Sequence, residues 1–156
     1  MSNFYNAQIC LNGHVISYYS EDIEKFCSQC GAKTITSCPN CGTNIRGMKD
    51  YDIPTIGAVY TLPSYCPECG SPYPWTQSKL DAMKELIDFD ENLSPDEKDY
   101  MNSNLKDLTV DTPKTKVVAT KFKSYLRKAG TAVASSIREI LVDIASEAAK
   151  KIIFQQ

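Results

Sequence analysis

Four short stretches between Cys10 and Cys69 decide how the first half of the chain folds. They read Cys10-Leu-Asn-Gly-His14, Phe26-Cys-Ser-Gln-Cys-Gly31, Ser37-Cys-Pro-Asn-Cys-Gly42 and Tyr65-Cys-Pro-Glu-Cys-Gly70. Together they hold all seven cysteines and the only histidine of the 156-residue chain. Each stretch places two soft ligands on one tight turn, and eight such ligands complete two tetrahedral Zn²⁺ sites. The sequence therefore predicts two structural zinc ions per chain.

The order of the ligand pairs leaves two arrangements open. Sequential pairing gives a first site of Cys10, His14, Cys27 and Cys30 and a second site of Cys38, Cys41, Cys66 and Cys69. A cross-braced arrangement joins the first pair with the third and the second pair with the fourth. Only seven residues separate Cys30 from Cys38, which is short for a hairpin that brings two such turns onto one metal. This spacing favours sequential pairing.

Composition and cysteine usage narrow the class of protein. The net charge is −2, and no basic, apolar leader or run of about 18 uncharged apolar residues stands out, so we expect no membrane-spanning helix. Cysteines spaced as C-x2-C are typical of metal sites in the cytoplasm, where we expect the protein. Four protein ligands per zinc leave no position for a reacting water. The sequence favours a non-catalytic binding or assembly protein and leaves an enzyme as the minority interpretation.

Beyond Trp75 the chain has no cysteine, and its pattern becomes helical. We therefore predict a small α+β protein. Residues 1–75 form a double zinc-ribbon module with short β-hairpins, in which Ile45, Ile56, Val59 and Tyr60 are expected to be buried. Residues 76–156 form a mostly helical region with helices at about 78–90, 95–108 and 113–154, the second of which starts at a capping box, Ser94-Pro-Asp-Glu97.

The last predicted helix carries an apolar stripe that repeats every eleven residues. A helix of this length is about 60 Å long, which exceeds what a compact domain of this size can cover. We therefore expect a dimer or tetramer, with the helix of one copy meeting that of another. The residues assigned to this contact are Phe122, Leu126, Val133, Ile137, Ile140 and Ile144. The competing interpretation breaks the helix at Gly130 and folds it back as a monomeric hairpin.

Charge is distributed unevenly along the second half. Residues 114–128 hold six bases and no acid: Lys114, Lys116, Lys121, Lys123, Arg127 and Lys128. The simplest interpretation packs this segment beside the acidic stretch 80–111 or leaves both in solvent. The first functional alternative is nucleic-acid binding through these bases. The second is a membrane-surface or defence effector, and a protein partner also stays open.

The motifs resemble those of bacterial zinc ribbons. More broadly, the chain resembles an uncharacterised family of small bacterial proteins known as a domain of unknown function. The matching stretches are Ala7-Gln-Ile-Cys-Leu-Asn-Gly-His-Val15, the three C-x2-C turns, Pro74-Trp75, Asp111-Thr-Pro-Lys-Thr-Lys116 and Ser146-Glu-Ala-Ala-Lys-Lys151. The resemblance implies a zinc-ribbon protein with a helical C-terminal half and implies no activity.

Overall fold

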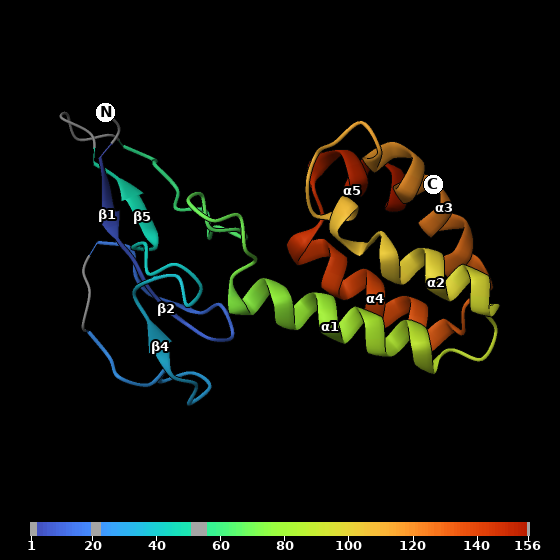
Figure 1. The fold of residues 1–156 in the computed structure, drawn as a ribbon, viewed down its shortest axis with the longest axis horizontal. Helices are drawn as coiled ribbons and strands as arrows, with labels where there is room; N and C mark the ends of the chain where they lie inside the picture. The colour runs from blue at the N-terminus through green and yellow to red at the C-terminus, as the bar shows by residue number, and fades with distance from the viewer. Residues whose placement is uncertain (1–2, 20–22, 51–55, 156) are drawn as a thin grey trace. The chain divides into compact units, whose positions relative to one another are not determined.

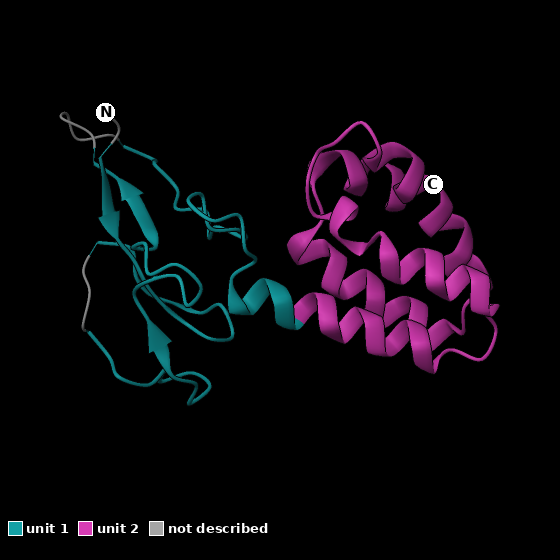
Figure 2. Ribbon diagram, viewed as in Figure 1, with its two compact units in different colours: residues 1–78 teal, residues 79–156 magenta. Residues whose placement is uncertain are grey.

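The chain forms two compact units, which are residues 1–78 (unit 1) and residues 79–156 (unit 2) (Figure 2). The computed structural model describes residues 3–19, 23–50 and 56–155. Unit 1 consists of short strands and tight turns, whereas unit 2 is helical (Figure 1). The predicted small α+β class, with strands first and helices after, is confirmed.

The strands of unit 1 form two small antiparallel sheets. Their bounds are β1 (Phe4–Asn6), β2 (Gln8–Cys10), β3 (Val15–Ser17), β4 (Thr34–Ile35) and β5 (Arg46–Lys49). One sheet pairs β1 with β5, and the other has the order β3-β2-β4. In the second sheet Ile9 lies opposite both Val15 and Ile35, so β2 is its central strand. β2 ends at Cys10, and the sheet therefore fixes the first predicted ligand.

The three C-x2-C turns share one backbone geometry. In each, the first cysteine donates its N–H across the turn, and the glycine after the second cysteine donates back to the first cysteine, at 2.8 Å in all three. Gly31, Gly42 and Gly70 have φ of 75°, 80° and 74°. Only glycine adopts this left-handed conformation without a steric penalty, which is why glycine closes each turn.

Unit 1 has a small buried cluster made of Ala7, Ile9, Cys38, Ile45, Cys66, Tyr73 and Trp75. The prediction for Ile45 is confirmed, and Tyr60 is half-buried against this cluster. The prediction that Ile56 and Val59 are buried is wrong, because their side chains are 101% and 84% exposed. Ile56 lies in a turn with Gly57, and no strand within the described residues carries either side chain back to the cluster.

Unit 2 packs its helices around a larger apolar core. The helices are α1 (Pro74–Phe89), which begins in unit 1, α2 (Pro95–Ser103), the 3-10 helix η1 (Leu105–Leu108), α3 (Thr115–Lys128), α4 (Thr131–Ile144) and α5 (Glu147–Ile153). The predicted capping box at Ser94 is present, with Glu97 as its partner. Each helix turns one apolar face inward, and the largest buried side chains include Met83, Ile87, Phe122, Ile137 and Leu141.

The prediction of one continuous helix over 113–154 is wrong. α3 ends at Lys128, and Ala129 and Gly130 adopt extended backbone with ψ of 157° and 144°. The N–H of Gly130 donates to the Asp90 carboxylate at 2.7 Å, so this backbone group is satisfied outside a helix. The competing interpretation, a break at Gly130, is the one observed.

A second break, which the apolar pattern does not predict, separates α4 from α5. Ser146 caps α5 by accepting a hydrogen bond from the N–H of Ala149, and its own N–H donates to the carbonyl of Leu108 at 2.9 Å. The eleven-residue stripe keeps its phase across the break at Gly130, where α3 buries Phe122 and Leu126 and α4 buries Val133 and Ile137. It does not keep its phase across the second break, because α5 buries Ala149 and Ile153, which lie outside the repeat.

Candidate metal centres

The first candidate centre lies where β2, the turn after it and the first C-x2-C turn meet. It contains Cys10, His14, Cys27 and Cys30, whose donor atoms all lie within 4.8 Å of one another. The Cys10 N–H donates to the carbonyl of His14 at 3.0 Å, which closes the turn between them. The His14 ring presents Nδ1 to the cluster, 3.4 Å from Cys10 Sγ and 3.6 Å from Cys27 Sγ.

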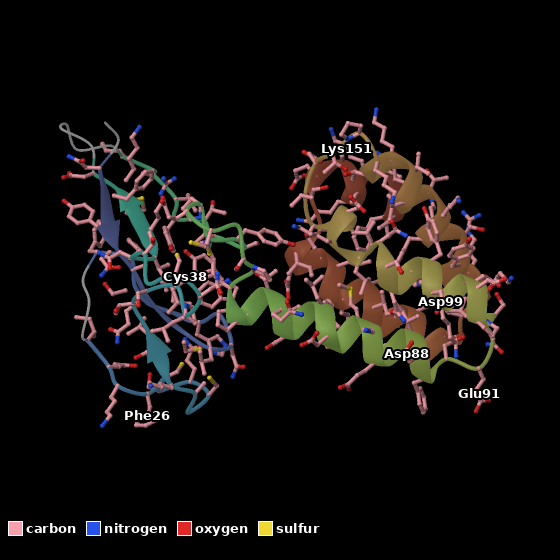
Figure 3. All side chains as sticks on the ribbon, in the orientation of Figure 1. Phe26, Cys38, Asp88, Glu91, Asp99 and Lys151 are labelled. Atoms are coloured by element: carbon pink, nitrogen blue, oxygen red, sulfur yellow. The ribbon has the colours of Figure 1, made fainter. Side chains whose placement is uncertain are left out.

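The second candidate centre joins the other two C-x2-C turns. Its donors are Cys38, Cys41, Cys66 and Cys69, and they satisfy the same 4.8 Å limit. Sulfur–sulfur distances across the two turns are 3.7 Å for Cys38 and Cys69 and 3.6 Å for Cys41 and Cys66. Cys38 lies inside unit 1 in Figure 3, and its side chain is 3% exposed.

These distances match tetrahedral zinc. With Zn–S bonds of about 2.3 Å and Zn–N bonds of about 2.0–2.1 Å, neighbouring corners lie about 3.8 Å apart for two sulfurs and about 3.6 Å apart for sulfur and nitrogen. The sulfur–sulfur distances of 3.6–3.7 Å and sulfur–nitrogen distances of 3.4–3.6 Å agree with both values. A disulfide would place its sulfurs at about 2.05 Å, and all seven cysteines are free.

The grouping follows the sequential arrangement. The structure brings the first predicted pair together with the second and the third with the fourth. The short connection from Cys30 to Cys38 contains β4, which pairs with β2 and carries the chain from one centre to the other.

Hydrogen bonds favour the thiolate form of one exposed cysteine in each centre. The pKa of Cys30 falls to about 6, chiefly because the Ala32 N–H and then the Asn12 side chain donate to its sulfur. The Asn12 Nδ2 lies 3.3 Å from Cys30 Sγ. The pKa of Cys69 falls to about 6 as well, with the Asn40 side chain as the largest cause. Both thiols are therefore prepared for a cation before one binds.

Burial acts in the opposite direction on one cysteine of each centre. It raises the pKa of the Cys38 thiol to about 11 and raises the pKa of the Cys10 thiol, although backbone N–H groups partly oppose it. A buried thiolate needs a nearby positive charge, which a divalent cation supplies. Each centre thus combines an exposed, acidic thiol with a buried one that depends on the metal.

Sequence reasoning missed the polar side chains that surround the sulfurs. Asn12 and Asn40 each lie between two ligands of one turn, in Cys-Leu-Asn-Gly-His and Cys-Pro-Asn-Cys. An asparagine between two ligands was therefore a feature of the sequence from which a side-chain donor to the sulfurs could have been predicted. Tyr73 was not predictable in this way, because it reaches the second centre from beyond its last ligand.

The six predicted basic residues lie on the solvent side of α3 and just before it. Lys123 is half-buried and the other five are exposed, while Val118, Phe122 and Leu126 occupy the buried side. Lys128 pairs with Glu97 at 2.7 Å, and this is the one salt bridge of the segment among the described residues. Lys114 donates to Asn104, Lys121 lies over the Tyr100 ring, and Lys123 donates to the carbonyl of Gln155.

The residues assigned to self-association lie inside unit 2. Phe122, Leu126, Val133, Ile137 and Ile144 are buried in its core, and Ile140 packs against that core. The core of unit 2 is large enough to cover the apolar stripe, because the long helix expected to carry it is divided into α3, α4 and α5. The chain's own helices cover these side chains, so they are not available to a second copy.

Comparison with known families assigns the chain. The family DUF2321, described as an uncharacterized protein conserved in bacteria, matches residues 3–153, and the chain belongs to it. The resemblance inferred from the motifs is thereby confirmed. No curated protein and no solved structure matches the chain significantly. Within the described residues, no helix has the length and apolar character needed to cross a membrane.

Proposed function

We propose that this protein is a non-catalytic binding module in which two structural Zn²⁺ ions hold unit 1 together. The observation that carries the proposal is the pair of four-donor clusters with tetrahedral spacing. Thiolate and imidazole are the donors that zinc prefers. Sets of four cysteines, or of three cysteines and one histidine, are typical of structural sites.

The donor inventory also supports a non-catalytic role. A catalytic zinc keeps one position for water or substrate, whereas each cluster here supplies four protein ligands. The two clusters use every cysteine and the only histidine of the chain. What remains for acid–base chemistry is carboxylates, lysines and tyrosines, and we assign none of them a catalytic role.

The test is a metal count on the purified protein. We expect about two zinc ions per chain, no disulfide by mass, and release of both ions to a strong chelator with loss of structure in unit 1. Trp75, the only tryptophan, is buried among the ligand turns, so its fluorescence reports that loss directly. A count near one, iron in place of zinc, or disulfide-linked cysteines would contradict the proposal.

A second candidate function is nucleic-acid binding through α3. It is favoured because few of the basic side chains on and just before α3 form ion pairs. Of the six bases, only Lys128 forms an ion pair with a described residue. The acidic residues of unit 2 therefore do not neutralise most of this positive charge. α3 packs against α5, whose Lys151 is exposed. Figure 3 shows Lys151 on the other side of unit 2 from Asp88, Glu91 and Asp99.

Salt dependence tests this candidate. Binding of fluorescent single- and double-stranded oligonucleotides should weaken steeply with salt. Lys116→Gln with Arg127→Gln should lower the slope by about 0.9 for each duplex phosphate that the variant no longer neutralises. The matched control removes two bases elsewhere, Lys33→Gln with Lys84→Gln, and should change little. Absence of binding at low salt would exclude the candidate, and binding to anionic vesicles instead would assign the face to a membrane.

A further inference from the structure

The hydroxyl of Tyr73 is a buried polar group close to the second centre. Tyr73 is 0% exposed, and its hydroxyl makes no hydrogen bond of ordinary geometry with the described residues. Buried hydroxyls are nearly always satisfied, because an unsatisfied one loses its water without replacement. The group therefore indicates an interaction that is completed when something else is bound.

The surrounding contacts fix where this hydroxyl lies. The Tyr73 N–H donates to the carbonyl of Ser64 at 3.0 Å, which ties the residue to the start of the last cysteine turn. Its ring stacks on Trp75 with centroids 4.8 Å apart and planes 20° apart. Trp75 is held in turn by its Nε1, which donates to the carbonyl of Pro63 at 2.9 Å. The backbone hydrogen bond and the ring stacking together restrict the position of the Tyr73 ring.

The polar neighbours of the hydroxyl are two ligands of the second centre. Tyr73 belongs to the same buried cluster as Cys38 and Cys66. Burial first, and then the charge and hydrogen bonding of Cys66, raise the pKa of the Tyr73 hydroxyl, and the charge of Cys38 acts in the same direction. A tyrosine hydroxyl, whose ordinary pKa is about 10, carries a proton at neutral pH and can donate a hydrogen bond.

We propose that the Tyr73 hydroxyl donates a hydrogen bond to the metal-bound thiolate of Cys66. The inference rests on the proposed zinc function, since Cys66 is a permanent thiolate only as a ligand. Groups that hydrogen-bond to a ligand orient it and tune the metal's affinity. Tyr73 is then a positioning residue for the second centre alone.

The first centre provides an internal contrast. Its side-chain donor, Asn12, is exposed and reaches the exposed ligand Cys30. Tyr73, by contrast, is buried in the same cluster as the buried ligand Cys66. Water can replace the first interaction but not the second, so loss of the tyrosine hydroxyl should affect its centre more strongly.

Substitution of Tyr73→Phe removes only the hydroxyl, and cadmium NMR resolves the two centres because only the first one contains a histidine. We expect the variant to bind two Cd²⁺ ions, with a shifted resonance for the second centre and an unchanged one for the first. During competition with a chelator, the second centre should lose about 10- to 100-fold in affinity. In the wild type, a through-bond coupling should join the cadmium to a tyrosine hydroxyl proton.

Tyr60→Phe is the matched control. Its hydroxyl donates to the carbonyl of Arg46 at 2.6 Å and its ring packs against the same cluster, so it reports the loss of a hydroxyl unrelated to the metal. If Tyr73→Phe and Tyr60→Phe leave the resonance and affinity of the second centre equally unchanged, the inference is wrong while zinc binding stands. If Tyr73→Phe does not fold, absence of the wild-type coupling overturns the inference. A wild-type chain that binds fewer than two ions overturns both proposals.

Discussion

Unit 1 and unit 2 have the same length, 78 residues each, but differ in the size of their buried cores. Eighteen residues form the buried core of unit 2, whereas the corresponding cluster of unit 1 has seven among the described residues, and two of those are metal-ligand cysteines. Burial of so few apolar side chains does not offset the conformational entropy of a chain this long. Under the proposed zinc function, unit 1 depends on metal ligation for its stability and unit 2 on the hydrophobic effect.

The largest expected effect is the loss of unit 1 alone when its ligands are removed. Structural zinc binding supplies roughly 10–16 kcal/mol of apparent free energy at neutral pH, more than a small domain's net stability. Cys38→Ser should unfold the second centre and its surroundings, and a chelator should unfold the rest of unit 1. Trp75 fluorescence should report the change, while far-UV circular dichroism retains the helices of unit 2.

The control for this experiment is addition of zinc, which should restore the wild-type fluorescence after chelation but not that of Cys38→Ser. Simultaneous loss of the helical signal in the metal-free wild type would contradict the comparison, because it would show that unit 2 also depends on the metals.

The converse experiment is a cavity in unit 2. Phe122 is 0% exposed at the centre of its core, so Phe122→Ala should destabilise unit 2 by roughly 3–5 kcal/mol. Urea unfolding followed by far-UV circular dichroism measures the change, and the zinc content should stay at that of the wild type. Phe89→Ala is the control, since Phe89 is 77% exposed and its truncation should change stability by less than about 0.5 kcal/mol. Equal effects would contradict the assigned core.

Asp90 makes unit 2 sensitive to acid. Its carboxylate accepts hydrogen bonds from the N–H groups of Asn92, Leu93 and Gly130. Burial alone would raise the pKa of Asp90, but these donors outweigh burial and lower it. A lowered folded-state pKa means that the stabilisation is present above the unfolded value of about 3.9 and is lost as the pH falls through the folded value.

Asp90→Ala should therefore cost unit 2 roughly 2–4 kcal/mol at neutral pH, because three N–H groups lose their acceptor. Urea unfolding at a series of pH values should show a smaller acid-induced loss in the variant than in the wild type. Glu91→Ala, in which the altered residue is exposed just after α1, is the control. If the stability of the wild type does not decrease when the pH is lowered below about 4, the role of Asp90 is contradicted.

The sequence predicted unit 1 better than unit 2 for a physical reason. A tetrahedral centre needs particular residue types on tight turns, so Cys10 to Cys69 specify the ligands, the turn glycines and the favoured pairing before any packing is known. Helix breaks depend on tertiary partners instead. Gly130 was a visible candidate for a break, but its partner Asp90 lies 40 residues earlier and could not be inferred from local pattern.

The break at Gly130 also shows a limit of pattern reasoning. The apolar stripe keeps the same phase in α3 and α4 as it would in one long helix, so periodicity alone does not distinguish the two arrangements. At Ser146 the phase does change, because α5 buries Ala149 and Ile153, which lie outside the repeat. The expectation of self-association rested on a surplus stripe in one long helix, so the breaks remove the reason for expecting a second copy. Ile56 and Val59 were misplaced as well, because an apolar side chain in a turn-rich segment need not reach the small cluster of unit 1.

The smallest expected effect tests what starts α5. The Ser146 hydroxyl accepts a hydrogen bond from the Ala149 N–H at 3.3 Å, and Ser146→Ala should cost about 1 kcal/mol because the first turn of α5 loses its side-chain cap. The carbonyl of Leu108 keeps its partner, since the backbone N–H of residue 146 is unchanged. Ser135→Ala is the matched control: Ser135 is exposed inside α4, where alanine is the better helix former, so the change should be slightly stabilising. Urea unfolding of unit 2 measures both variants against the wild type. Opposite signs for the two serines would show that Ser146 acts as a helix start, whereas equal effects would mean that packing alone divides α4 from α5.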